Sequence, residues 1–317
     1  MNLLKIGAGA IVTSTLGLLA ACTGNKEKLP MVEEPVLSTR MLPLPSPENT
    51  PYIAVARGDE VNATVRTTIA ALGGIDRFVK NGNDVIIKPN ICNASNTWEY
   101  ASTTNPQVVA TLVTLCFEAG AKRVRVMDQP FGGTAAMAYE RSGISEMVKA
   151  AGGEMEIMSS MKFRDFEIRE GIDIKEWPVY MDCLETDVLI NVPIAKHHAL
   201  ARLTLGMKNL MGIIENRPQF HFNLGQRLAD LASLVQPQLT VVDAIRILKN
   251  HGPTGGDMAD VEQTNTIIAS HDMVAADSFA TRLFGLTPGD IPALRCAENM
   301  RLGVTDLTTV EVEEINV

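Results

Sequence analysis

Short apolar runs that alternate with helix-length segments constrain the fold of this chain more than any other feature. The runs at 84–88 (DVIIK), 187–192 (DVLINV) and 239–242 (LTVV) show no polar alternation, which is typical of parallel strands buried on both faces. Between the first two runs, residues 104–120 have apolar side chains at helical spacing and a proline in the first turn. This β–α alternation predicts an α/β fold with a mostly parallel sheet flanked by helices.

Weaker patterns predict the remaining elements. We expect further strands at 52–56, 123–127, 155–158, 266–269 and 309–312, helices at 61–72, 134–151 and 273–284, and mainly helical segments between 193 and 234.

Length and composition indicate a large folded domain. The chain has 317 residues, of which 46% are hydrophobic and only 5% aromatic, enough to bury a large aliphatic core and to exclude an intrinsically disordered protein. We expect one large domain or two closely packed lobes over residues 52–317. The formal net charge of −9 argues against nucleic acid as a partner, because binding to phosphates needs a basic surface.

The first 21 residues predict a signal peptide. Lys5 precedes an apolar stretch that contains several glycine, serine and threonine residues. A permanent membrane span needs about 20 apolar residues, so this stretch favours processing instead. It ends in LAAC at 19–22, which resembles the lipobox of bacterial lipoproteins, in which the cysteine is acylated and becomes the mature N-terminus. The alternative is an ordinary signal peptide that is cleaved nearby and leaves Cys22 unmodified.

Residues 22–51 predict a flexible tether that follows the lipid-attachment site. Six prolines and several charged residues keep such a segment extended and unable to pack a core. The sequence therefore predicts an exported, lipid-anchored protein that faces the periplasm or the cell exterior and has the membrane as a partner through its anchor. Which membrane holds the anchor, and whether the protein is oligomeric, are left open.

Four cysteines lie in the predicted domain, namely Cys92, Cys116, Cys183 and Cys296. They form no C-x-x-C pair, which excludes a ferredoxin-type or zinc-ribbon site. An oxidising compartment permits one or two disulfides among them, whereas the apolar surroundings of Cys116 and Cys296 favour buried free thiols. Cys92 is also a candidate reactive thiol, because Lys88 lies nearby in sequence, although a packing or disulfide role is the simpler interpretation.

Polar residues follow four of the predicted strands at their carboxyl ends, where ligands bind in open α/β sheets. If these positions served only to connect elements, turn formers such as glycine, asparagine or serine would be expected there. We predict that the residues converge on one crevice. They are Lys88 and Asn90 after 84–88, Asp128 after 123–127, Lys196, His197 and His198 after 187–192, and Asp243 after 239–242. For Asp243, capping of the next helix is an equally good alternative.

An ordered series of motifs resembles a known family. The motifs are IKPN at 87–90, TTNP at 103–106, DQP at 128–130, NVP at 191–193, KHH at 196–198, LGMKNLMG at 205–212, VVDA at 241–244, GP at 252–253 and AAD at 275–277. Together they resemble the domain of unknown function 362 family from about residue 52 to residue 303. Some members of that family carry an appended four-iron four-sulfur module, which this sequence lacks. The family pattern usually has Lys-x-His, so His198 matches it and His197 is an addition. The resemblance leaves the reaction open.

Three lysines, Lys88, Lys196 and Lys208, predict an anion site in the crevice. Compact ammonium charges in a partly dry cleft stabilise a carboxylate or a phosphate strongly. Lys208 and its neighbour Asn209 lie at the predicted start of a helix, whose backbone N–H groups would add to the positive field.

The alternative is that the lysines form internal ion pairs with Asp128, Asp243 and Asp277 that only hold the loops in place. Asp277 lies in a predicted helix on a largely apolar face. Because an unpaired carboxylate would be costly there, we expect it to pair with a lysine.

His198 is the candidate general acid or base beside an anionic substrate, and Lys196 and Asp128 complete the candidate catalytic set. A mixed nitrogen and oxygen metal site formed by His198, Asp128, Asp243 and His221 is the alternative, but no tight ligand spacing supports it. We therefore assign no metal ligands, and the cofactor stays unknown. The sequence supports two functions. One is an enzyme that acts on a small anionic metabolite and that a metal or a redox partner could assist. The other is a non-catalytic lipoprotein that binds an anion.

Overall fold

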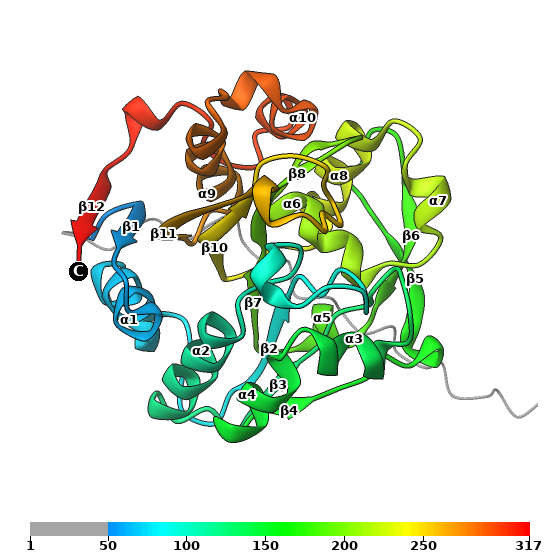
Figure 1. Cartoon of the computed structure of the whole chain (residues 1–317). Coiled ribbons are helices and arrows are strands. Elements are labelled where there is room, and N and C mark those ends of the chain that lie inside the picture. Colours follow the sequence, from blue (N-terminus) through cyan, green and yellow to red (C-terminus); the bar gives the residue numbers. More distant parts are fainter. Residues whose placement is uncertain (1–49) are drawn as a thin grey trace, which may run out of the picture. The chain divides into compact units, whose positions relative to one another are not determined.

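The computed structural model describes residues 50–317, which form a ten-stranded sheet with helices on both faces (Figure 1). The strand order is β12-β1-β11-β10-β7-β2-β3-β4, with β8 paired to β10 and β9 paired to β8. Six of these strand pairs are parallel, and three, β1–β11, β10–β11 and β8–β9, are antiparallel. The predicted α/β class is therefore confirmed. The predicted signal peptide, Cys22 and almost all of the tether lie outside the described residues.

The strands have the following bounds. They are β1 (Ile53–Arg57), β2 (Asp84–Pro89), β3 (Arg123–Val126), β4 (Glu154–Met155), β5 (Phe163–Glu167), β6 (Glu176–Tyr180), β7 (Val188–Val192), β8 (Ile194–His198), β9 (Arg202–Thr204), β10 (Leu239–Leu248), β11 (Val261–Ser270) and β12 (Val312–Asn316). The β5–β6 pair forms a separate antiparallel hairpin. Because β7, β2 and β3 run parallel side by side, their carboxyl ends lie at one edge of the sheet.

The helices are α1 (Val61–Ala71), α2 (Pro106–Glu118), α3 (Ala135–Arg141), α4 (Ile144–Ala150), α5 (Asp182–Glu185), α6 (Gly206–Asn209), α7 (Arg217–Phe220), α8 (Leu224–Leu234), α9 (Met273–Ala280) and α10 (Pro292–Asn299). The core has two large clusters, one containing α1, α2 and α4 and the other containing α6, α8, α9 and α10, and a small third one formed by Ala101, Ile194 and Leu248. In β2, Ile86 packs into the second cluster and Val85 and Ile87 into the first, as alternation along a strand requires. Within residues 50–317, no helix has the length and apolar character needed to cross a membrane.

The segment between 193 and 234 differs most from its prediction. We expected mainly helix there, but it begins with the antiparallel pair β8–β9. Pro193 ends β7 because proline offers no ladder donor, and the chain then resumes pairing beside β10. Lys196 and His198 therefore lie on a strand instead of a loop.

Other predicted elements shift in their bounds. The predicted strands at 239–242 and 266–269 extend into the long antiparallel pair β10–β11, whose outer part carries polar residues that hide the strand pattern. The predicted helix at 134–151 is interrupted at Gly143, which has a left-handed φ of 75°. The last strand, expected at 309–312, begins only at Val312.

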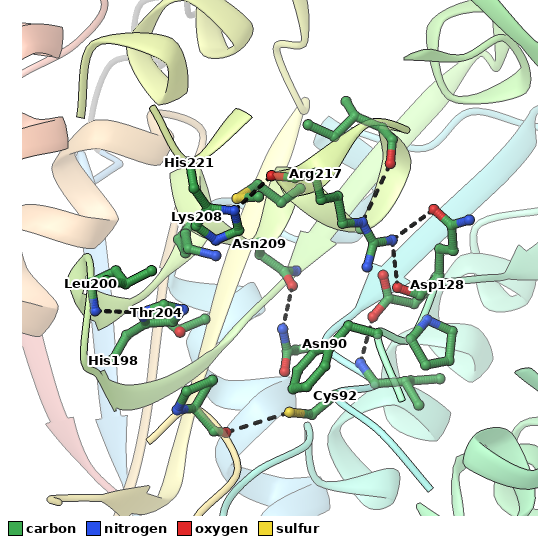
Figure 2. Close-up of a pocket in the computed structure, with 18 of the residues that line it drawn as sticks. Asn90, Cys92, Asp128, His198, Leu200, Thr204, Lys208, Asn209, Arg217 and His221 are labelled. Carbon is green, nitrogen blue, oxygen red and sulfur yellow. Dashed lines mark hydrogen bonds between the residues drawn. The ribbon is translucent and has the colours of Figure 1, made fainter. Parts of the chain in front are cut away.

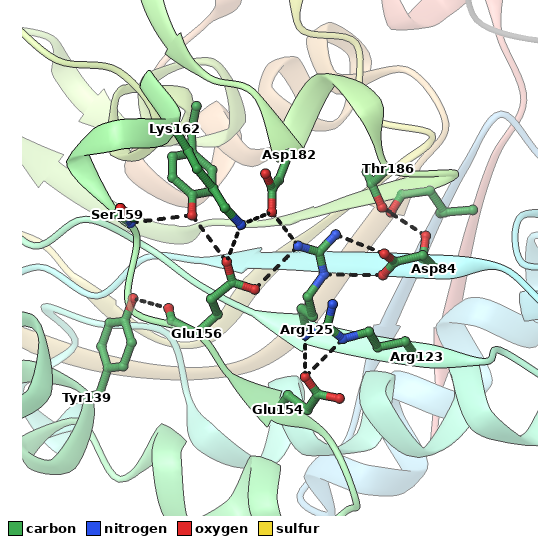
Figure 3. Close-up of polar contacts among 12 residues, drawn as sticks. Asp84, Arg123, Arg125, Tyr139, Glu154, Glu156, Ser159, Lys162, Asp182 and Thr186 are labelled. Atoms are coloured by element: carbon green, nitrogen blue, oxygen red, sulfur yellow. Dashed lines mark hydrogen bonds and ion pairs between the residues drawn. The ribbon is translucent and has the colours of Figure 1, made fainter. Parts of the chain in front are cut away.

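Arg125 on β3 joins several segments through a charge network away from the predicted crevice (Figure 3). Its guanidinium forms ion pairs with Asp84 at 3.0 Å, Glu156 at 3.3 Å and Asp182 at 2.6 Å. Lys162 pairs with the last two carboxylates as well. The network ties β3 to β2, to the segment after β4 and to α5.

Asp277 on α9 holds the start of α6. Its two carboxylate oxygens accept hydrogen bonds from the backbone N–H groups of Gly206 at 2.6 Å and Met207 at 2.9 Å. The expected pairing of Asp277 with a lysine is therefore wrong, because backbone amides supply its partners. We had expected the first N–H groups of α6 to add to the positive field around a ligand. Two of them donate to Asp277 instead. Burial raises the pKa of Asp277 to about 7.

We predict that Asp277→Ala lowers the free energy of unfolding by about 1–3 kcal/mol, because two buried N–H groups lose their acceptor. Denaturant unfolding followed by circular dichroism measures this change. Asp165→Ala is the matched control, since Asp165 lies exposed on β5. Equal loss of stability in the two variants would contradict a role for Asp277 in anchoring α6.

Candidate functional site

A cavity of about 890 Å³ opens beside the carboxyl ends of β2 and β3 and along β8 (Figure 2). It brings together most of the residues predicted to form the site. These are Lys88, Asn90, Asp128, Lys196, His198, Lys208 and Asn209. The crevice rule for parallel sheets thus located one continuous group of polar side chains.

Asp243 does not line this cavity. Its carboxylate is buried in β10 and accepts hydrogen bonds from the backbone N–H groups of Asn105 at 2.7 Å and Ile245 at 3.0 Å. Burial raises its pKa to about 6. We had expected Asp243 to follow the end of a strand, but β10 continues to Leu248, so Asp243 lies within the strand. It holds the turn that precedes α2 instead of facing the ligand cavity.

A chain of hydrogen bonds forms one wall of the cavity. Lys196 Nζ donates to Asn90 Oδ1 at 3.0 Å, and Asn90 Nδ2 donates to Asn209 Oδ1 at 2.9 Å. Lys88 Nζ donates to the same Asn209 oxygen at 2.7 Å. This chain, which we call the lysine–asparagine chain, connects β8, the residues after β2 and α6.

The ammonium group of each of these two lysines contacts three protein acceptors: Lys196 makes three hydrogen bonds, and Lys88 makes two hydrogen bonds and one ion pair. Lys88 also bonds to Pro89 O at 3.0 Å and pairs with Asp128 Oδ1 at 2.9 Å. Lys196 also bonds to the carbonyl oxygens of Ser102 and Pro253. Burial lowers the pKa of both lysines. They therefore build the cavity wall and its positive field, and direct contact with a ligand stays a prediction for both.

The alternative for the lysines was internal ion pairs with Asp128, Asp243 and Asp277. The described residues contain one of these pairs, Lys88–Asp128. The carboxylates of Asp243 and Asp277 accept hydrogen bonds from backbone amides instead. Gly212 makes the pair sterically possible. A Cβ at this position would lie 1.8 Å from Asp128 Oδ1 and 2.5 Å from Lys88 Nζ, so any other residue would displace them. Gly212 belongs to the motif at 205–212.

Lys208 on α6 differs from the other two lysines. Its Nζ has no hydrogen-bond or ion-pair partner anywhere in the part of the chain that the structure describes. Burial, followed by the nearby charges of Lys196 and Arg217, lowers the pKa of Lys208 to about 7. A substantial fraction of this amine is therefore uncharged at neutral pH.

Two histidines of the cavity are held in opposite tautomers. His198 Nδ1 accepts hydrogen bonds from the backbone N–H groups of Leu200 at 3.1 Å and Ala201 at 3.2 Å, so the proton of the neutral ring lies on Nε2. His221 Nδ1 lies 2.6 Å from the carbonyl oxygen of Arg217, which can only accept. His221 therefore carries its proton on Nδ1 and keeps a lone pair on Nε2.

The electrostatic surroundings keep both rings neutral. Burial, followed by the charge of Lys208, lowers the pKa of His198 to about 3, and burial also lowers the pKa of His221. In Figure 2 the side chain of Lys208 lies between the two imidazole rings. The cavity thus offers one neutral ring N–H donor and one ring nitrogen with a free lone pair.

The sequence did not point to Arg217 or Thr204, which also line the cavity. Arg217 Nη2 bonds to Gln129 O at 2.6 Å and Oε1 at 2.7 Å, while its Nη1 has no hydrogen-bond partner within residues 50–317. Thr204 Oγ1 is buried and has no partner among the described residues. Arg217 lies on α7 and Thr204 on β9, both within the segment that we expected to be mainly helical. Neither residue follows a predicted strand, so the strand-end rule did not identify them.

The cavity carries an excess of positive charge. Its charged lining residues are the cations Lys88, Lys196, Lys208 and Arg217 and the carboxylates Asp128 and Glu215. Lys88 and Asp128 pair with each other, which leaves Lys196, Arg217 and the partly charged Lys208 against Glu215, and this excess favours an anionic ligand.

The described residues contain no group of three or more histidine, cysteine, aspartate or glutamate side chains that could hold a metal ion. The alternative set of His198, Asp128, Asp243 and His221 is not assembled, because Asp128 pairs with Lys88 and Asp243 lies outside the cavity. Cys92 lines the cavity as a free thiol and donates to Pro253 O at 3.4 Å, in agreement with a packing role. The other cysteines of the described domain are free thiols too: Cys116, Cys183 and the half-buried Cys296.

The chain belongs to a family of α/β proteins defined by sequence. The model of that family, domain of unknown function (DUF362), matches residues 85–282, more than half of the chain. A curated relative, the thylakoid-associated protein sll1697 of Synechocystis sp., is 29% identical over 253 residues, which cover 77% of this chain and 76% of the relative.

Two solved structures resemble the described domain. A protein from Thermotoga maritima has a TM-score of 0.44 and 13% identity, with 72% of this chain and 60% of that chain covered. The lactate racemase apoprotein from Thermoanaerobacterium thermosaccharolyticum has a TM-score of 0.46 and 12% identity, with 76% of this chain and 58% of that chain covered.

We predict that His198 is neutral and protonated on Nε2, and that His221 is protonated on Nδ1, at neutral pH. Long-range ¹⁵N–¹H correlation spectra of ¹⁵N-histidine-labelled protein distinguish the two tautomers, and His198→Gln and His221→Gln assign the signals. Because the pKa of His198 is lowered to about 3, its ring should stay neutral from about pH 8 down to about pH 5. A His198 ring that gains a proton within this range would contradict the assignment.

Proposed function

We propose that this protein is an enzyme that acts on a small anionic metabolite bound in the cavity. The observation that supports this most directly is Lys208, a basic side chain that has no partner within residues 50–317 and lies in a cavity whose cations outnumber its carboxylates. A bound carboxylate or phosphate would supply the missing counter-charge, and its attraction to Lys208 would be strong because the site is partly desolvated.

In this proposal Nη1 of Arg217, which has no partner among the described residues, also contacts the anion. The lysine–asparagine chain and Asp128 act as positioning groups, because their polar atoms already bond to one another.

In this proposal the two histidines have different roles in acid–base catalysis. His198 was the predicted general acid or base, but its Nδ1 is occupied by two backbone N–H groups. A neutral ring in this state donates a hydrogen bond from Nε2 and polarises a substrate oxygen without releasing its proton. Proton removal then falls to Nε2 of His221, whose lone pair is free.

We predict that pyruvate or inorganic phosphate binds to the purified protein and that Lys208→Met weakens this binding at least about tenfold, through loss of about 1.4 kcal/mol. Isothermal titration calorimetry measures both affinities. Lys122→Met is the matched control, since Lys122 is exposed and does not line the cavity. Unchanged affinity in Lys208→Met, or no binding of either anion to the wild type, would contradict the proposed site.

The same titration separates an enzyme from a non-catalytic anion-binding protein. His198→Gln keeps a hydrogen-bond donor near the same place, so an enzyme should retain anion affinity in this variant while losing turnover. Loss of affinity in His198→Gln would favour the binding protein.

We also propose that the mature protein is anchored to a membrane through acylated Cys22 and faces the periplasm or the cell exterior. The lipobox-like sequence at 19–22 supports this, and so does the similarity to the thylakoid-associated Synechocystis protein. In a bacterial host, the protein should incorporate labelled palmitate and sediment with membranes, whereas Cys22→Ser should do neither. Palmitate labelling that persists in Cys22→Ser would contradict this anchor.

A further inference from the structure

Lys208 is the lysine of the cavity whose nitrogen is free to react. The ammonium groups of Lys88 and Lys196 each make three contacts with protein acceptors, so neither nitrogen can reach a ligand without breaking them. Lys208 Nζ makes no such contact with any described residue, and it faces the cavity between His198 and His221. A nucleophilic amine needs this combination of access and freedom from hydrogen bonds.

The groups around Lys208 favour its uncharged form. Lys196 on β8, Arg217 on α7 and Lys88 on β2 are fixed cations that repel a further positive charge, and burial adds to their effect. Cys92 acts in the opposite direction, and Glu215 is the remaining carboxylate of the lining besides Asp128. The neighbouring histidine rings are themselves held neutral. Desolvation and adjacent cations are the means by which lysines become nucleophiles in proteins.

We propose that Lys208 forms an imine with the carbonyl carbon of a small 2-oxo acid bound in the cavity. This inference rests on the proposed function and names its substrate class. The carboxylate of such a substrate would meet Nη1 of Arg217, while its carbonyl group lies beside Lys208. The excess positive charge accounts for the carboxylate, and the free amine accounts for the carbonyl group.

The chemistry balances without an oxidant or a reductant. The uncharged Lys208 nitrogen attacks the carbonyl carbon, a C–N bond forms, and the C–O double bond becomes a single bond. His221 Nε2 takes a proton from the nitrogen and returns it to the oxygen, giving a carbinolamine. A second transfer of this kind expels the oxygen as water, so both amine hydrogens leave with it and a C=N bond remains. His198 Nε2–H donates a hydrogen bond to the oxygen during both steps.

Reductive trapping tests the proposal on the wild-type protein. Pyruvate and sodium cyanoborohydride are added at neutral pH, and peptide mass spectrometry locates a stable adduct with the mass of one pyruvate minus one oxygen atom. We expect the adduct on Lys208 to form at least about tenfold faster than on exposed Lys122, since each unit by which the pKa is lowered raises the uncharged fraction about tenfold. Lys88 and Lys196 should stay unlabelled.

Lys208→Arg is the labelling control, because arginine cannot form the imine: the adduct at position 208 should be lost while labelling of Lys122 stays unchanged. Pyruvate binding to the wild type, measured by titration calorimetry, separates this proposal from the proposed function. If the wild type binds pyruvate and Lys208 is labelled no faster than Lys122, the imine proposal is wrong and the anion site stands. If the wild type shows neither anion binding nor labelling, both proposals fail.

Discussion

The buried lysine–asparagine chain is the constraint on which the rest of the site depends. Burying an ammonium group costs several kcal/mol unless its donors are satisfied, and this cavity wall contains two such groups. The structure offsets the cost mainly with neutral acceptors, because Lys196 has three oxygens around it and no carboxylate. Such an arrangement requires accurate placement of Asn90 and Asn209, since a shift of either asparagine would leave a buried donor without its acceptor.

That placement depends in turn on the segment that carries Asn209. Helix α6 has only four residues and too few internal hydrogen bonds to hold itself. Asp277 binds its first amides from α9, and Gly212 lets the following turn pass directly over the Lys88–Asp128 pair. Lys208 lies on the same short helix, so the groups that fix the wall also fix the reactive amine relative to it.

How far the site could be predicted from the sequence depends on which elements carry its residues. Parallel strands bring their carboxyl ends to one edge, so Lys88 and Asp128 could be located from apolar runs alone. The same rule was wrong for Asp243 because β10 continues through polar positions that the apolar pattern did not include. Arg217 and Thr204 could not be found in this way, because α7 and the β8–β9 pair follow a proline-interrupted segment without a clear period.

Burial and the fixed cations of the wall together keep the histidines neutral. Burial is the largest cause that lowers the pKa of His198, His221 and Lys208. The charge of Lys196, which is held by its three acceptors, adds to this effect at His198 and Lys208. As a result, the His198 ring stays neutral and can donate a hydrogen bond, and part of the Lys208 amine is uncharged. The wall thereby attracts an anion and, by the same charges, keeps a nitrogen lone pair available beside it. Lys88 and Lys196 contribute charge while their nitrogens stay bonded to protein acceptors, whereas Lys208 contributes a nitrogen that is free to react.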